Sequence, residues 1–287
     1  MIKAIFTNIK DEHRYLESWI EYHIRIGINL FIIYEDEGSK SHSSIISKYS
    51  NVCRIDFYDY VLKNDSDEFK DLTCFKHIFD NYTDIDWLIK IDPDEYIILP
   101  SDCSSIDDIL YPESQKDINQ IYLSWKLYNA NGFIDSPYPG KYNIKDTYLM
   151  PIRYEDLNKD FKANTSNNDY NLGKSFINYK KYKTSFESRL NPNLISIAFP
   201  HFIFNEPKTE EVNGFVINHY ITKSFEEFYE RLKDKGEYNP IYYRKLGDFF
   251  ILNPDLIPSI PSIENKYNVN VFDFNTKINS KILNLNE

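Results

Sequence analysis

The sequence predicts an α/β protein with a mostly parallel central sheet flanked by helices, followed by a less regular C-terminal portion. Through residues 1–100, short apolar runs alternate with stretches of helical periodicity. This alternation is typical of a parallel sheet with helices on both faces. The apolar runs are continuous, which indicates strands buried on both faces. Hydrophobic residues make up 42% of the 287 residues, so a sizeable core is expected.

The first predicted elements are two strands joined by a helix. Residues 2–7 form the first strand. The apolar residues after it recur at the i, i+3, i+4 and i+7 spacing of an amphipathic helix: Leu16, Trp19, Ile20 and His23. Gly27 is expected to end this helix. Residues 30–34 then form the second strand, which ends at the polar residues 35–39.

The next elements repeat this alternation. A short helix at about residues 41–49 leads to a third strand over residues 52–57. The apolar residues that follow mark another helix: Phe69, Leu72, Phe75, Phe79 and Tyr82. Residues 87–91 form a fourth apolar strand.

Beyond residue 120 the pattern is less regular. Strands are expected over residues 121–127, 195–204 and 215–221, and a polar loop over residues 155–173. One more helix has an apolar face made of Phe225, Phe228, Tyr229 and Leu232. Pro, Asn and Ser are frequent from residue 253 onward, so this segment is expected to wrap the surface or to mediate oligomerisation.

Charge and cysteine content exclude several classes of protein. The formal net charge of −11 argues against a nucleic-acid partner and against strong adsorption to anionic lipid. The three cysteines, Cys53, Cys74 and Cys103, have no metal-site spacing, which favours a reducing compartment over a disulfide framework. The N-terminus resembles neither a signal peptide nor a membrane span. We therefore expect a cytosolic protein, and peripheral attachment to a membrane stays open.

Two carboxylates at the end of the fourth strand are the first candidate site. Open α/β sheets bind ligands beyond the carboxyl ends of their strands. Asp92 and Asp94 stand two residues apart, so both side chains project to the same side of an extended backbone, and Pro93 stiffens the turn. Hard cations such as Mn²⁺ or Mg²⁺ take oxygen ligands and keep positions open for phosphate. A solvated acidic loop is the alternative, because a D-x-D triplet is common by chance.

Ordered motifs along the chain give a more specific signal. They lie at residues 10–23, 34–39, 86–97, 125–132, 173–175 and 218–228. In this order and spacing, over roughly residues 1–235, they resemble the motifs of the glycosyltransferase family 2-like and family 92 (DUF23-type) proteins. The resemblance implies a GT-A-like fold, that of Rossmann-like nucleotide-diphospho-sugar transferases. It implies transfer of a sugar from a UDP- or GDP-sugar, with Mn²⁺ or Mg²⁺ and with inversion.

The resemblance also suggests an acceptor class and a domain plan. The acceptor would be a surface polysaccharide, a lipid-linked oligosaccharide or a glycoprotein. Residues 1–235 would be the transferase domain, with a nucleotide-binding half (1–100) and an acceptor half (101–235), and residues 236–287 a C-terminal extension. Two other classes stay open, a metal-dependent nucleotide phosphohydrolase and a non-enzymatic carbohydrate-binding protein.

Metal and phosphate contacts follow from the same resemblance. Asp94 would coordinate the metal, and Asp92 would lie near the metal or the donor ribose. His219 would be a third metal ligand or a diphosphate contact, with an imidazole packed among aromatic rings as the alternative. Lys223 and Ser224 open a helix whose N–H groups favour phosphate. Ser224 also forms an S-x-x-E capping box with Glu227, and both interpretations can hold together.

The remaining candidates concern the nucleoside and the acceptor. Thr7, Lys10 and Glu12 follow the first strand, where GT-A proteins seat the base, although Lys10 and Glu12 are equally plausible as exposed charges. Asp36 is the better candidate for hydrogen bonding the base or ribose, although Glu35-Asp36-Glu37 replaces the usual Asp-Asn pair, so which acid aligns stays open. Residues 128–130 also depart from the family motif, so which residues form the wall of the acceptor site stays open.

The catalytic base and two further contacts complete the set of candidates. Asp135 is our choice for the base and Glu206 is its rival; an exposed loop carboxylate is the alternative for both. Lys174 and His201 would line the diphosphate or the acceptor side, with a solvated lysine and a core histidine as the alternatives.

Overall fold

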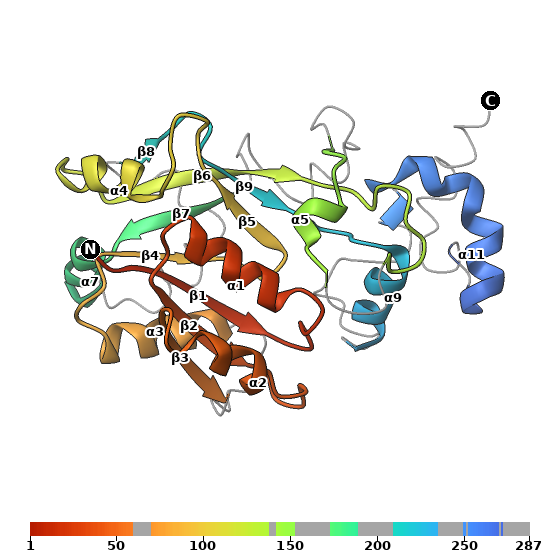
Figure 1. Ribbon diagram of the computed structural model, residues 1–287, viewed down its shortest axis with the longest axis horizontal. Helices are drawn as coiled ribbons and strands as arrows, with labels where there is room; N and C mark the ends of the chain where they lie inside the picture. The colour runs from red at the N-terminus through yellow and green to blue at the C-terminus, as the bar shows by residue number, and fades with distance from the viewer. Residues whose placement is uncertain are drawn as a thin grey trace. The chain divides into compact units, whose positions relative to one another are not determined.

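The computed structural model of the chain (Figure 1) describes residues 1–59, 70–137, 142–152, 173–188, 209–234, 249–250, 252–269 and 271. The strands are β1 (Lys3–Ile9), β2 (Leu30–Glu35), β3 (Arg54–Asp59), β4 (Trp87–Lys90), β5 (Glu95–Ile98), β6 (Gln120–Leu127), β7 (Gly173–Asn178), β8 (Thr209–Glu211) and β9 (Val216–His219). The main α-helices are α1 (Leu16–Arg25), α2 (Ser43–Ile46), α3 (Lys70–Asn81), α4 (Asp107–Ser114), α5 (Ile144–Thr147), α7 (Tyr179–Ser188), α9 (Phe225–Asp234) and α11 (Ile260–Tyr267). Two 3-10 helices are η1 (Ser47–Tyr49) and η4 (Pro254–Ser259).

The described strands form one nine-stranded sheet whose N-terminal half is parallel. The strand order is β3-β2-β1-β4-β7-β6-β9-β5, and β8 pairs with β6 beside this path. β1 is parallel to β2 and β4, and β2 is parallel to β3. The carboxyl ends of β1, β2 and β4 therefore lie at the same edge of the sheet.

Each face of the parallel strands is covered by a helix, because successive side chains of a strand point to opposite faces. Phe31 of β2 contacts Trp19 of α1, with ring centroids 5.7 Å apart. Its neighbours Leu30 and Ile32 lie instead in a core cluster with Phe75 of α3. The predicted α/β fold class, a central sheet flanked by helices, is confirmed.

The other half of the sheet is mixed, and the sequence did not predict all of it. β7 is antiparallel to β4 and β6, and β5 is antiparallel to β9. β5 was missed because it has only four residues and follows β4 after a short turn, so no separate strand was predicted there. β7 begins with the polar Gly173-Lys174-Ser175, and its partners are distant in the sequence. The predicted strand at residues 195–204 and most of the predicted loop lie outside the described residues.

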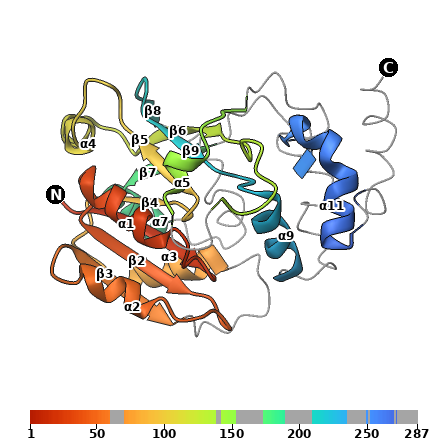
Figure 2. The same ribbon diagram turned by 45° about the vertical axis from the view of Figure 1, so that its right-hand side comes forward.

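The chain divides into two compact units: Met1–Lys126 with Asn168–His219, and Leu127–Asn167 with Tyr220–Glu287. The first unit contains the sheet. The second contains α9 and α11 (Figure 2) and has its own aromatic core, where Phe225 of α9 contacts Phe249 and, on α11, Tyr267. The predicted domain boundary at residue 235 stays a prediction. None of the helices in the described part of the chain combines the length and apolar character needed to cross a bilayer.

Gly173 allows β7 to approach β6 closely. A Cβ atom at this position would lie 2.2 Å from the carbonyl oxygen of Leu123 and 2.6 Å from the hydroxyl oxygen of Tyr122. Both neighbours belong to β6, and the carbonyl oxygen is backbone that cannot rotate away. The glycine thus sets the separation of the two strands and, with it, the position of Lys174.

We predict that Gly173→Ala lowers the free energy of unfolding by about 1–3 kcal/mol, because the added methyl group overpacks the contact with β6. Urea denaturation measures this value. Ser175→Ala on the same strand is the matched control: the buried Ser175 hydroxyl has no hydrogen-bond partner within the described part of the chain, so its loss should not lower the free energy of unfolding. Equal stability of Gly173→Ala and the wild type would contradict the close approach.

Candidate functional site

A tight turn at the end of β4 holds the acidic motif. The N–H of Glu95 donates to the carbonyl oxygen of Asp92 (2.9 Å), and the N–H of Asp92 donates to Oε2 of Glu95 (2.7 Å). Pro93 occupies the second position of this turn, which its fixed φ favours. Two hydrogen bonds thus close residues 92–95 into a rigid unit that directs the side chains of Asp94 and Glu95.

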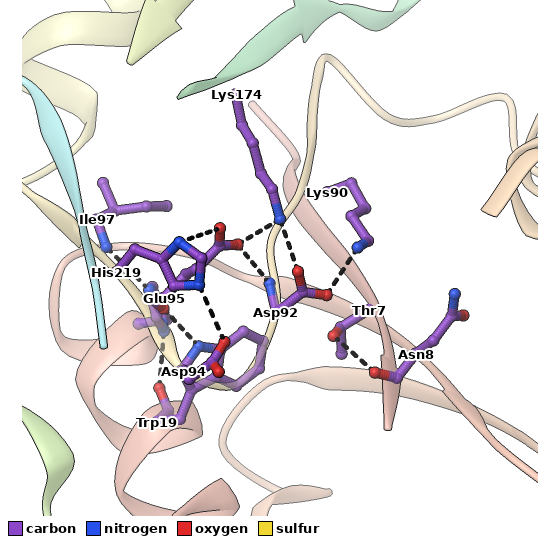
Figure 3. A network of polar contacts seen from close by, with 11 residues as sticks. Thr7, Asn8, Trp19, Lys90, Asp92, Asp94, Glu95, Ile97, Lys174 and His219 are labelled. Atoms are coloured by element: carbon purple, nitrogen blue, oxygen red, sulfur yellow. Dashed lines mark hydrogen bonds and ion pairs between the residues drawn. The ribbon is translucent and has the colours of Figure 1, made fainter. Parts of the chain in front are cut away.

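The antiparallel pairing of β5 with β9 brings His219 to this turn. The register places His219 directly opposite Glu95. In Figure 3 the imidazole faces both acidic side chains, with Nε2 3.9 Å from Oδ1 of Asp94 and Nδ1 3.9 Å from Oε1 of Glu95. Asp94, Glu95 and His219 are exposed by only 4%, 0% and 6%. The Trp125 ring packs against His219, with centroids 4.6 Å apart, and restricts its orientation.

Two buried lysines neutralise the other side of the turn. Lys90 Nζ lies 2.7 Å from Oδ1 of Asp92, and Lys174 Nζ lies 2.9 Å from Oδ2 of the same carboxylate. Lys174 also forms an ion pair with Glu95 (Figure 3). Both oxygens of Asp92 therefore face ammonium groups. Lys90 is not among the residues predicted from the sequence, although a lysine inside the buried run Trp87–Ile91 indicates an ion pair.

The pKa values of the two carboxylates in this network are shifted in opposite directions. Burial alone would raise the pKa of Asp92, but the ammonium groups of Lys174 and Lys90 hold it well below its usual value. For Glu95, burial dominates and raises the pKa to about 7; Lys174 lowers it and the charge of Asp92 adds to the rise. Asp92 is therefore ionised at neutral pH, whereas Glu95 is partly protonated there.

Asp94 and His219 have the separation that two ligands of one divalent ion require. Ligand atoms about 2.1 Å from an ion lie about 3.0 Å apart at right angles and about 4.2 Å apart when opposite. The observed 3.9 Å between Nε2 and Oδ1 falls within this interval. Among the described residues, no cluster of three or more His, Cys, Asp or Glu side chains could hold a metal ion. The pair therefore fits an ion completed by phosphate oxygens and water, and Asp92 as a ligand stays a prediction.

The predicted nucleoside contacts lie at the ends of β1 and β2. Thr7 is buried within β1, Lys10 is exposed, and Glu12 and Asp36 are half-buried. The N–H of Asp36 donates to the carbonyl oxygen of Ile9 (2.9 Å), so the two strand ends are joined. The structure thus brings these candidates to neighbouring strands, and their contacts to a ligand stay predictions.

A buried Glu35–His42 pair helps to decide which of the three acids at the end of β2, residues 35–37, corresponds to the aspartate of the family motif. Oε1 of Glu35 accepts the backbone N–H of His42 (2.8 Å) and lies 2.5 Å from its Nδ1. The ring of His13 stacks on His42, with centroids 3.8 Å apart. Burial lowers the pKa of His42, against the opposing effect of Glu35. Glu35 is thus engaged inside the protein, which favours the half-buried Asp36 as the acid that meets a ligand.

The candidates in the second unit have other partners. The Glu227 N–H donates to Ser224 Oγ (3.2 Å), and Ser224 Oγ donates to Oε2 of Glu227 (3.0 Å). The capping interpretation of Ser224 is therefore confirmed, and its phosphate contact stays a prediction. Lys223 is buried and has a left-handed backbone, with φ 54°. Its phosphate contact also stays a prediction.

Asp135, the predicted catalytic base, forms an ion pair with Lys266 within the second unit. Tyr267 Oη donates to Oδ1 of Asp135 (2.6 Å), and Lys266 Nζ lies 2.5 Å from the same oxygen. The hydrogen bonds from Lys266 and Tyr267 lower the pKa of Asp135, which makes the carboxylate a weaker base. Its rival Glu206, like His201, lies outside the described residues.

We predict that Glu95→Gln gains stability relative to the wild type as the pH rises from about 4.5 to about 7. The folded protein keeps a proton on Glu95 that the unfolded chain releases, so wild-type stability falls across this interval. Urea denaturation at several pH values should show a relative gain on the order of 1–3 kcal/mol. Glu113→Gln, outside the network, is the control. A difference that does not change with pH would contradict the assignment.

Comparisons with known proteins give structural similarity without a family. No protein-family model and no curated protein matches the chain. The structure is similar to S. aureus TarS 1–349 in complex with UDP, at 10% identity and a TM-score of 0.46, over 81% of this chain and 64% of that chain. It is also similar to HddC from Yersinia pseudotuberculosis, at 12% identity and a TM-score of 0.35, over 82% and 99% of the two chains. Glucosyl-3-phosphoglycerate synthase from Mycobacterium tuberculosis, with Mn²⁺ and UDP, matches 44% of each chain at 12% identity and a TM-score of 0.30. At these values the comparisons assign no family to the chain.

Proposed function

We propose that the chain is a metal-dependent glycosyltransferase of the GT-A type, related to the family 2-like and family 92 proteins. It would transfer a sugar from a UDP- or GDP-sugar to a glycan, lipid-linked or glycoprotein acceptor, with inversion. The observation that carries the proposal is the buried Asp94–His219 pair at 3.9 Å. Asp94 lies in the turn that follows the parallel strand β4, at the ligand-binding edge of such sheets, and His219 ends β9 beside this turn.

Asp94 and His219 would hold Mn²⁺ or Mg²⁺. Both are almost fully buried, and the Trp125 ring packs against the imidazole. A neutral imidazole suits Mn²⁺ and a carboxylate suits either ion. When bound, the ion would neutralise the diphosphate of the donor and help the nucleotide to leave.

The lysine network adds positive charge beside this pair. Lys90 and Lys174 contribute two positive charges, Asp92 contributes one negative charge, and Glu95 is partly protonated near neutral pH. The four groups together are therefore neutral to singly positive, which favours an approaching diphosphate. The ionised Asp92 retains acceptor capacity for a ribose hydroxyl, since its side chain is 33% exposed.

The remaining roles are proposed from the sequence. Thr7, Lys10, Glu12 and Asp36 would contact the nucleoside, and Lys223 and Ser224 would contact phosphate. Asp135 would take the proton of the acceptor hydroxyl, although Lys266 and Tyr267 hold its carboxylate. We also propose a cytosolic location, with which the three free cysteines agree.

We predict that Asp94→Asn and His219→Ala each weaken Mn²⁺-dependent binding of a nucleoside diphosphate at least tenfold, about 1.4 kcal/mol. Each variant removes one of two protein ligands while the rest of the turn persists. Calorimetry with UDP, GDP and CMP, with and without Mn²⁺, measures the effect.

Asp107→Asn is the matched control, because this carboxylate pairs with Lys3 at the start of α4. It should bind like the wild type. If no nucleoside diphosphate binds in the presence of any divalent metal, the transferase proposal is wrong. Cleavage of a nucleotide sugar that is unaffected by any acceptor would indicate a phosphohydrolase instead.

A further inference from the structure

Three side chains of α1 bind the backbone of β5. The indole N–H of Trp19 donates to the carbonyl oxygen of Glu95 (2.8 Å), and the hydroxyl of Tyr22 donates to the carbonyl oxygen of Ile97 (2.7 Å). The backbone N–H of Ile97 donates to Nε2 of His23 (3.4 Å). The three residues lie at i, i+3 and i+4, so they share one face of the helix.

These contacts occupy the open edge of a terminal strand. β5 is the last strand in the order of the described sheet, and its strand partner is β9. Glu95 and Ile97 are two residues apart, so their backbone groups turn to the same edge of the strand. That edge would otherwise present unpaired backbone groups. The side chains of α1 satisfy three of these groups in place of a further strand.

These hydrogen bonds require one particular tautomer of the neutral His23 ring. Nδ1 lies 2.8 Å from the carbonyl oxygen of Trp19, so Nδ1 carries the proton and Nε2 is the acceptor for Ile97. His23 is fully buried, and burial lowers its pKa to about 3. The rings of Tyr22 and Tyr96 pack against the imidazole, with centroids 5.1 Å and 5.6 Å away. The neutral, correctly oriented ring is therefore fixed by its surroundings.

The position of β5 determines the geometry of the proposed ion site. Asp94 directly precedes β5, and His219 lies on β9 opposite Glu95. The backbone of β9 holds one edge of β5, and α1 holds the other. A shift of β5 along or away from β9 would change the 3.9 Å between Asp94 and His219. Metal–ligand distances vary by only about 0.2 Å around their usual values, so a shift that separates the two side chains would weaken binding of the ion.

We propose that Trp19, Tyr22 and His23 are positioning residues, which clamp β5 against β9 and so hold Asp94 at ion-binding distance from His219. This inference rests on the proposed function, because it assigns the clamp a role in binding the ion. The hydrogen bonds of the clamp all go to backbone groups of β5. The three side chains therefore affect the site without touching the ion or the donor.

Tyr22→Phe tests the clamp with the loss of a single hydroxyl group. Tyr22 is half-buried, so the variant is expected to fold. Tyr49→Phe is the matched control: it removes the hydrogen bond from Tyr49 to Glu21, which joins α1 to η1 instead of β5. Both variants lose one hydrogen bond to the same helix, at a similar cost of about 1 kcal/mol in stability.

The readouts are the Kd for Mn²⁺ in the presence of UDP and the hydrogen-exchange rates of residues 95–98 without ligand. We expect Tyr22→Phe to raise the Kd about three- to tenfold and to speed exchange in β5 by a similar factor. Tyr49→Phe should change neither. A Tyr22→Phe protein with wild-type Kd, or two variants that weaken binding equally, would overturn the proposal.

Failure of the proposed function gives a different pattern. If the wild-type protein binds no Mn²⁺ with any nucleoside diphosphate, the function and the role of the clamp in ion binding are both wrong. The exchange rates then still show whether α1 holds β5. Faster exchange in Tyr22→Phe alone would show that α1 holds β5 without a role in ion binding. Unchanged exchange would show that α1 does not hold β5 either.

Discussion

The structure around the proposed site depends on charge compensation inside the sheet. Lys174 is buried, and an isolated ammonium there would carry a large desolvation penalty. Asp92 provides a full negative charge and Glu95, with a pKa of about 7, provides part of one; the turn that joins them is closed by two hydrogen bonds between them. The ion pairs therefore fix the turn, and the turn fixes where Asp94 points. Removing one member would leave the others uncompensated, so the network behaves as a unit.

Local sequence patterns predicted the parallel half of the sheet and part of the site. Continuous apolar runs identified β1, β2 and β4, and the D-x-D triplet after β4 identified Asp94. His219 came from its motif, and the structure places it beside Asp94. β5 and β7 were missed because their strand partners are distant in the sequence, because β5 has only four residues, and because β7 begins with polar residues.

Long-range pairs explain the other omissions. Lys90 and Lys174 both form ion pairs with Asp92. A sequence pattern does not show that these three residues lie together. The inward turn of Glu35 toward His42 likewise depends on a buried contact, and no periodicity distinguishes it from Asp36. The apolar face of α1 predicted burial of Trp19 and His23 but gave no indication that their polar atoms bind β5.

Asp94 and His219 are proposed to bind one divalent ion together with the donor diphosphate. Electron spin-echo envelope modulation of the Mn²⁺–UDP complex tests it directly, because the method detects nitrogen bound to the manganese. We predict coupling to one imidazole nitrogen that disappears in His219→Gln and persists in His13→Gln. A Mn²⁺–UDP complex without nitrogen coupling, or with coupling that survives in His219→Gln, would contradict it.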